Sequence, residues 1–262
     1  MGAATRASTA AAVEALGAIK RPAVDLGGQL LSAARAIASS HQLVVILVDA
    51  GIPAEQRAAL AQKAVGAGFT AQAKSLLGLL AGGRWSDADD LVGAIEEVGF
   101  RALAAAKSAE GLESELFTVR SAITSDGRLE LALGNRASPV ESKLALVDTL
   151  LQDANPATRA IVRHVVLLPR GRKPVESIDR AQDIVAEGRD RLVAVVQTAR
   201  PLSSTQATAL AARLESAYGR KIAVNQVVEP DLVAGVRITI GDDVIDGTVR
   251  ARLDDLRLRL AG

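Results

Sequence analysis

The sequence of 262 residues contains no cysteine, and only 2% of its residues are aromatic. Without cysteine the chain can form no disulfide framework, no thiolate zinc site and no thiol nucleophile, and a reducing, cytosolic setting is favoured. So few aromatic rings argue against base-stacking surfaces and against haem or flavin pockets. These absences exclude several classes of secreted, redox and nucleic-acid-binding proteins.

An excess of one charge sign is also missing, since 31 basic side chains balance 30 acidic ones. A dedicated nucleic-acid binder or an acidic disordered tail needs a large imbalance. The longest aliphatic run, residues 43–48, is far shorter than the roughly 20 residues that span a bilayer. Residues 1–16 lack the apolar core of a signal peptide. We therefore expect no membrane span and no nucleic-acid partner.

Motifs for catalysis or cofactor binding are weak. His41 and His164 are the only histidines, and neither has a partner at metal-binding spacing, so both are interpreted as structural or surface residues. No phosphate-binding Gly-Lys-Ser/Thr sequence occurs. A stretch beginning at Asp242 partly matches a calcium loop, but its twelfth position is Leu253 instead of glutamate. The sequence predicts no catalytic site, no metal, no cofactor and no direct nucleotide binding.

The densest basic run covers residues 170–173. We interpret it as a solvated loop between helices, with contact to an acidic partner or to lipid headgroups as the alternative.

Apolar positions in the first two thirds of the chain recur at an offset of 86 residues. The recurring pairs include Leu26 and Leu112, Leu30 and Leu116, Ile37 and Ile123, Pro53 and Pro139, and Glu55 and Glu141. Within each copy the spacing i, i+4, i+7, i+11 is typical of one buried helix face. The pattern favours two copies of one packed unit over two unrelated helical stretches aligned by chance. It predicts two consecutive helical bundles, residues 1–88 and 89–172, followed by a connecting helix over 173–190.

The periodicity changes after this helix. Runs over 192–196, 222–228 and 236–240 have strand length and β-branched composition, and a helix is expected from Ser203 to Tyr218. Val249, Leu253, Leu256 and Leu260 form the apolar stripe of a final helix. The predicted fold is therefore mainly α, with a small α/β domain over 191–262.

The C-terminal region resembles a known family. The sequences DLVAGV at 231–236, GD at 241–242 and VIDGTVR at 244–250, followed by Leu253, are similar to the C-terminal motif of the delta subunit of bacterial F-type ATP synthase, the oligomycin-sensitivity-conferring protein family. We interpret the motif residues as structural. They are Gly235, Gly241, Asp242, Ile245, Asp246 and Gly247. Gly235 and Gly241 permit tight turns. Asp246 is placed to cap the last helix, and Gly247 lets the chain turn into that helix.

The resemblance has ordinary family spacing from about Leu112 to the end, whereas the first hundred residues depart from it and suggest a duplicated bundle. This extended form is similar to the delta region of high-GC Gram-positive bacteria, where delta can be fused to a membrane-anchored stalk helix. No such anchor is visible in the sequence, so a free-standing subunit and an excised part of a fusion both stay open.

The resemblance implies a non-catalytic stator subunit of the peripheral stalk, which links the catalytic head to the b stalk and resists rotor torque. It implies peripheral attachment, through the complex, to the cytoplasmic face of the plasma membrane. Its partners would be the N-terminal helices of alpha subunits and the b subunit. A helical-repeat adaptor unrelated to ATP synthase is the alternative, and an enzyme with an unfamiliar site is a more remote one.

The residues expected to receive an alpha helix are apolar positions on two helices of each bundle. They are Val13, Leu16, Leu76 and Leu80 in the first copy, and Leu103, Val162 and Val166 in the second. Val249, Leu253 and Leu256 are the candidates for the b contact. All of these residues could instead belong to the cores. The extra bundle would engage a second alpha N-terminus or brace the stalk laterally.

Overall fold

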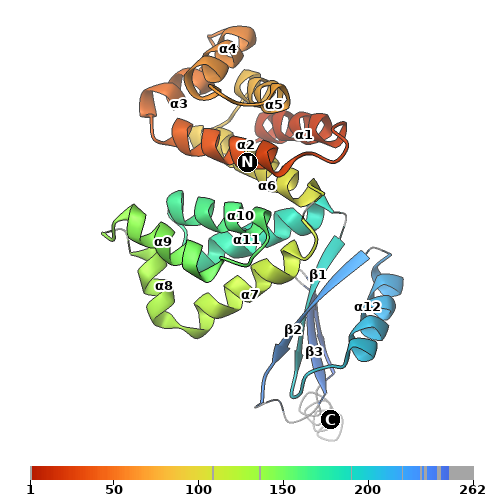
Figure 1. The fold of residues 1–262 in the computed structure, drawn as a ribbon. Coiled ribbons are helices and arrows are strands. Elements are labelled where there is room, and N and C mark those ends of the chain that lie inside the picture. Colours follow the sequence, from red (N-terminus) through yellow and green to blue (C-terminus); the bar gives the residue numbers. More distant parts are fainter. Residues whose placement is uncertain are drawn as a thin grey trace, which may run out of the picture. The chain divides into compact units, whose positions relative to one another are not determined.

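The computed structural model describes residues 2–247, except 108, 136, 190, 220, 231, 233, 234, 241 and 242. It divides into two compact units, residues 1–185 and 186–262. Among the described residues there are twelve helices and four strands (Figure 1). The predicted fold class, mostly helical with a small C-terminal sheet, is confirmed at this level.

The first unit begins with five helices that bury their apolar faces against one another. They are α1 (Ala3–Gly17), α2 (Val24–Ala38), α3 (His41–Val48), α4 (Ala54–Val65) and α5 (Ala71–Gly82). Their fully buried side chains include Leu26, Leu30, Ile37, Leu47 and Leu80. Short helices of this kind are stable only because tertiary packing covers their apolar stripes.

The sixth helix, α6 (Ala88–Ala105), belongs to two hydrophobic cores. Its first part, including Ile95 and Val98, packs in the core of α1–α5, while Phe100 and Leu103 pack in the next core. Figure 1 shows α6 running between the two sets of helices. The domain boundary at residue 88 stays a prediction, because α6, which follows it in the sequence, contributes side chains to the hydrophobic cores on both sides.

Five further helices complete this unit. They are α7 (Leu112–Ser125), α8 (Gly127–Gly134), α9 (Val140–Leu150), α10 (Pro156–Leu167) and α11 (Pro174–Gly188), which extends into the second unit. Their core contains Leu112, Leu116, Ile123, Val147 and Ile161. Helix α10 is capped at its start by Asn155, whose side chain accepts a hydrogen bond from the amide of Ala157.

The second unit contains a four-stranded sheet of order β2-β1-β3-β4. The strands are β1 (Arg191–Thr198), β2 (Lys221–Val228), β3 (Val236–Ile240) and β4 (Asp243–Asp246). Strands β1 and β2 are parallel and joined through α12 (Ser204–Tyr218), whereas β3 and β4 add antiparallel. Ser203 and Gln206 form a capping box at the start of α12, and its apolar side packs on the sheet through Leu214.

Candidate functional site

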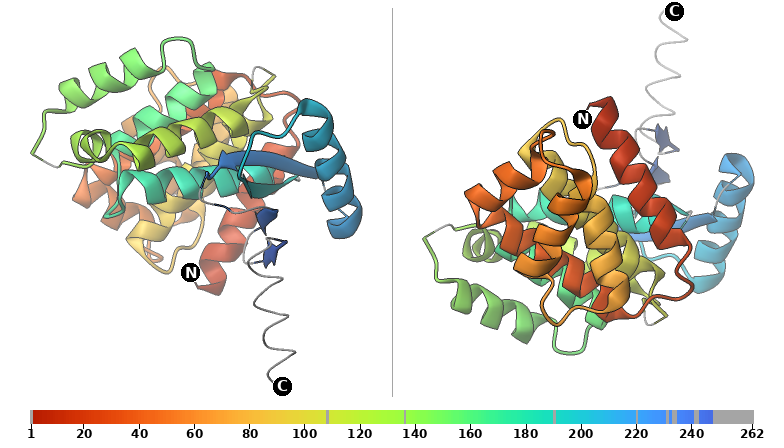
Figure 2. Two further views of the ribbon diagram at one scale, coloured as in Figure 1. Left: turned by 90° about the horizontal axis from the view of Figure 1, so that it is seen from below. Right: turned by 90° about the horizontal axis from the view of Figure 1, so that it is seen from above.

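The first unit carries an apolar groove between α1, α4 and α5, with a volume of about 470 Å³. Figure 2 shows α1 and α5 side by side at this end of the unit. Small residues form most of the lining, and Leu79, with 43% of its surface exposed, adds a larger apolar side chain. The lining includes Ala7, Ala11, Ala58, Gly78, Leu79 and Gly82. Ser8 and Glu55 are the polar residues of the lining, and the small apolar residues that form the rest suit the apolar face of a partner helix.

A buried arginine holds one end of this groove. Arg57 on α4 is only 4% exposed, and its guanidinium donates to five backbone carbonyls. The acceptors are Leu47, Ile52, Ala81, Gly82 and Gly83, at 2.6–3.2 Å. The last carbonyl groups of a helix have no hydrogen-bond donor within the helix. Arg57 supplies the donors for the carbonyl groups at the end of α5 and near the end of α3. It thereby fixes the stretch of α5 that lines the groove.

The residues predicted to receive an alpha helix lie mostly in the cores. Leu16, Leu76, Leu80, Leu103, Val162 and Val166 are each at most 8% exposed, and Val13 is half-buried. Their side chains are packed inside the unit, and the exposed positions beside them, such as Leu79, form the groove. The alternative that these residues are core was left open by the sequence, and their role in binding stays a prediction.

A second helical face, formed by α6 and α10, is covered by α2. Arg35 of α2 bonds to His164 of α10, and Leu31 of α2 packs in one core with Phe100 of α6. Helices α2 and α6 approach closely at two glycines, since a Cβ atom on Gly27 would lie 2.8 Å from the carbonyl oxygen of Gly99. Val165, on the same helix as His164, is 3% exposed. This second face is therefore filled by the chain itself.

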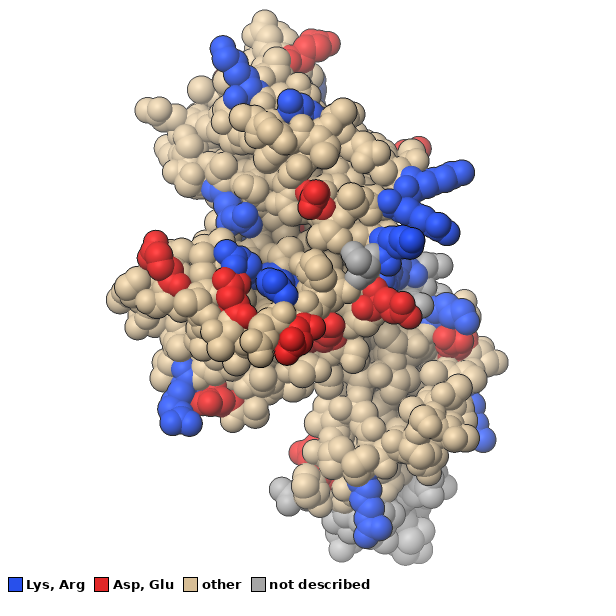
Figure 3. All heavy atoms as spheres, viewed as in Figure 1, with Lys and Arg blue, Asp and Glu red and all other residues tan. Residues whose placement is uncertain are grey.

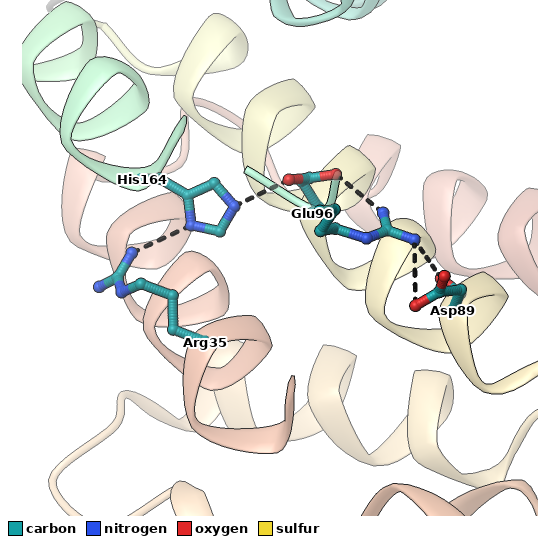
Figure 4. A network of polar contacts seen from close by, with 5 residues as sticks. Arg35, Asp89, Glu96 and His164 are labelled. Carbon is teal, nitrogen blue, oxygen red and sulfur yellow. Dashed lines mark hydrogen bonds and ion pairs between the residues drawn. The ribbon is translucent and has the colours of Figure 1, made fainter. Parts of the chain in front are cut away.

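A buried polar network joins α2, α6 and α10 beneath this contact (Figure 4). The His164 side chain is 0% exposed, with Nε2 2.9 Å from Oε1 of Glu96 and Nδ1 3.0 Å from Nη1 of Arg35. Because a guanidinium has no acceptor, Nδ1 must accept from Arg35, and Nε2–H donates to Glu96. The rings of His164 and Phe100 are also nearly perpendicular and in edge-to-face contact, with centroids 5.6 Å apart.

The second oxygen of Glu96 binds Arg170, which lies beyond the end of α10. Nη1 of Arg170 is 3.1 Å from Oε2, and Nη2 donates to the backbone carbonyl of Asp89 at 2.6 Å. Burial would raise the pKa of Glu96, but the hydrogen bond from His164 and the positive charge of Arg170 hold that pKa below its ordinary value. The carboxylate therefore stays charged between its two partners.

The network corrects one interpretation of the sequence. Arg170 was expected in a solvated loop, yet its side chain is only 11% exposed and forms an ion pair inside the unit. His164 has the structural role that the sequence predicted for it. The one local signal for the network was Glu96 itself, a carboxylate on the apolar side of a helix that buries Ile95 and Val98. Its partners lie 68 and 74 residues away and have no signal near it.

Part of the C-terminal motif lies within the described residues, and its structural role stays a prediction. Gly235 has φ of +101°, a conformation that favours glycine. Asp246 ends β4 and accepts two hydrogen bonds from Arg237 at 2.9 and 3.1 Å, and the amide of Gly247 donates to the carbonyl of Val236. Ile245 is half exposed on the edge strand. Gly241, Asp242 and the b candidates Val249, Leu253 and Leu256 lie outside the described residues.

Over the described part of the chain, no group of three or more His, Asp or Glu residues could hold a metal ion. In that same part no single helix is long and apolar enough to cross a membrane, and only α2 and α3 together, across a bend of 104°, pass such a test. The described structure thus combines an apolar groove on the helical unit with a separate α/β unit. Its class is that of a mostly helical protein with a small C-terminal sheet.

Comparison with known proteins gives the family. The family model "ATP synthase delta (OSCP) subunit" matches residues 100–260, which is more than half of the chain. The chain belongs to the ATP synthase delta (OSCP) subunit family, so the resemblance predicted from the C-terminal motif is confirmed.

Relatives share the additional N-terminal region. An ATP synthase subunit delta of Leifsonia xyli is 42% identical over 265 residues, covering 100% of both chains. That of Streptomyces avermitilis is 36% identical and covers 98% of both. A chain from the mitochondrial ATP synthase hexamer of Toxoplasma gondii is similar to 63% of this chain at 22% identity, with a TM-score of 0.40. Residues 1–99 lie outside the family model, but the matches to these two delta subunits extend over nearly the whole chain and so include this region.

Proposed function

We propose that this chain is the stator link of an F-type ATP synthase, which holds the alpha/beta head against rotor torque and connects it to the b stalk. It acts by gripping helices of other subunits and carries out no reaction itself. The observation that carries the proposal is the open apolar groove between α1 and α5 in a member of the delta (OSCP) family. Its place would be peripheral, at the cytoplasmic face of the plasma membrane.

The extra N-terminal region is proposed to be a second copy of the helical unit. Helices α3 and α8 begin at His41 and Gly127, and α4 and α9 begin at Ala54 and Val140, in both cases 86 residues apart. Buried positions recur at the same distance, which supports the proposal. The pairs include Leu30 and Leu116, Ile37 and Ile123, Leu47 and Leu133, and Leu76 and Val162. The bundles would then span residues 1–88 and 89–172, with the connecting helix at 173–190.

In this scheme the first copy presents an open groove at α1 and α5, and α2 covers the equivalent face of the second copy. Leu79 is 43% exposed, whereas Val165, 86 residues later, is 3% exposed. Gly78 lines the groove in the first copy, and its counterpart His164 is bonded to Arg35 of α2. We infer that one alpha N-terminal helix binds at α1 and α5, and that the equivalent face of the second copy holds the two copies together.

The b stalk is proposed to bind the C-terminal α/β unit, with Val249, Leu253 and Leu256 as candidate contacts. Two attachments on one chain add avidity, so each need only be of standard size, about 1,200–2,000 Å². Separate attachments also allow the head to be held while small elastic movements continue.

The groove is tested with a synthetic alpha N-terminal helix and the full chain. Leu79→Glu should weaken binding by at least about tenfold, because a carboxylate would be buried in an apolar contact. Leu131→Glu is the matched control, since Leu131 is 72% exposed on α8. Equal affinity of both variants would contradict the groove as the site.

The wider proposal is tested in the complete enzyme. Removal of this chain should uncouple ATP hydrolysis from proton pumping while the soluble head keeps its ATPase activity. Coupling that persists without the chain would reject the stator function.

A further inference from the structure

A second concave surface lies between α2 and α10. It shares no lining residue with the groove at α1 and α5. It is a cleft of about 390 Å³ lined by three arginines, Arg35 from α2 and Arg159 and Arg163 from α10. The two on α10 are four residues apart and so share one helix face. On the face shown in Figure 3, basic side chains border the hollow between the α2 and α10 sides of the first unit. Leu31 and Leu167 add an apolar part to the lining.

Only one of the three arginines has a carboxylate partner among the described residues. Arg163 is paired with Asp148. Arg35 bonds to the neutral acceptor Nδ1 of His164. Arg159 donates through Nη2 to the carbonyls of Gln152 and Ala154, while its buried Nε has no hydrogen-bond partner. Among the described residues, therefore, neither Arg35 nor Arg159 forms an ion pair with a carboxylate.

The three guanidinium groups share one cleft. Burial, and the positive charge of Arg163, lower the pKa of Arg35 below its ordinary value. An anion in a cleft lined by half-buried cations reduces this repulsion, and guanidinium groups bind oxyanions through paired hydrogen bonds. The cleft volume falls within the range of small-molecule sites, about 300–1,000 Å³.

We propose that the cleft binds a small anion of the pyrophosphate type through Arg35 and Arg159, with Arg163 as a flanking donor held by Asp148. Two phosphate groups can reach guanidiniums that come from two different helices, whereas one monovalent ion can compensate only one of them. A bound anion would bridge α2 and α10 and so strengthen the contact between the two sets of helices. The site is independent of the groove proposed for the alpha helix.

The test is calorimetric titration of the full chain with pyrophosphate at fixed ionic strength. Arg35→Gln and Arg159→Gln should each weaken binding by about tenfold or more, as expected for loss of a charged hydrogen-bond donor. Arg128→Gln removes the same charge from a side chain that is 95% exposed on α8, and should change the affinity less than about twofold. If Arg35→Gln fails to fold because its bond to His164 is lost, Arg159→Gln decides.

Three results would overturn the proposal. One is an affinity of the chain for pyrophosphate that is no higher than its affinity for chloride at the same ionic strength. Another is equal weakening in all three variants, which would indicate general charge attraction. The third is binding of a glutamate-rich helical peptide in the cleft without binding of pyrophosphate, which would make the cleft a protein-docking surface.

Discussion

His164 and Glu96, which are 68 residues apart in the sequence, join α10 to α6 through a hydrogen bond of 2.9 Å between Nε2 and Oε1. Both side chains are almost completely buried, at 0% and 4% exposure. Removing one partner of a buried charged contact lowers the stability of the fold strongly, because the other partner is left buried without an opposite charge or a hydrogen bond. The pair is therefore a sensitive place to test how the two sets of helices are held together.

Glu96→Gln should lower the free energy of unfolding at pH 7 by about 2–4 kcal/mol, because the charged acceptor for His164 and Arg170 is lost. The pKa of Glu96 is lowered in the folded protein from 4.5, so its contribution is present above about pH 4.5 and is lost as the pH falls through the folded value. The difference between wild type and variant should shrink from pH 5 to pH 3 in urea unfolding followed by circular dichroism. Glu141→Gln, at an exposed position, is the control. A difference that stays constant over this range would contradict the assignment.

Arg57→Met should destabilise the chain by about 3–5 kcal/mol, since five carbonyls would lose their donor in a buried position. Arg57→Lys should recover part of this loss, because an ammonium group supplies three donors. Urea unfolding gives the comparison, with Arg128→Met as the exposed control. A variant as stable as the control would mean that water replaces the guanidinium at the end of α5.

Gly27→Ala should destabilise the contact of α2 with α6 by about 1–3 kcal/mol, because the new Cβ would lie 2.5 Å from Cγ of Leu103. The neighbouring change Gly28→Ala is a matched control, since its Cβ meets nothing within 4 Å and alanine favours the helix by about 0.5–1 kcal/mol. Thermal unfolding should thus move in opposite directions for the two adjacent substitutions. If both substitutions shift the unfolding temperature in the same direction, α2 and α6 can move apart to accommodate the new Cβ without a loss of stability.

Each chain should bind one alpha N-terminal helix, because α2 covers the face of α6 and α10. Calorimetric titration of the full chain with the synthetic helix should give a stoichiometry near one, and Leu79→Glu should remove that single site. Two sites per chain would contradict the inference that the second copy is closed, while leaving the stator function itself in place.

Local structure could be predicted to a large extent from the sequence. The helix expected from Ser203 to Tyr218 is present as α12: the side chain of Ser203 caps its start, and Gly219 ends it in the left-handed conformation. These features depend on hydrogen bonds within a few residues, so the sequence alone contains the necessary information. The strands of the α/β unit were found for the same reason, because alternation along a strand is a local property.

The candidate site was predicted less well. Periodicity identified Leu76 and Leu80 as one apolar face of α5, but both are buried and Leu79 is exposed in the groove. A helix repeats its side chains every 3.6 residues, so an apolar stripe shows that a face is covered without showing what covers it. The sequence likewise gave no sign that α6 contributes to two cores.

The sequence by itself determined the family, through the C-terminal motif, and the helical and α/β character of the two regions. Only the tertiary structure decided that α2 closes the face of α6 and α10, that Arg170 is buried against Glu96, and that Arg35 and Arg159 face one cleft. These contacts join residues far apart in the chain, and their energies depend on burial and distance, which no local pattern specifies.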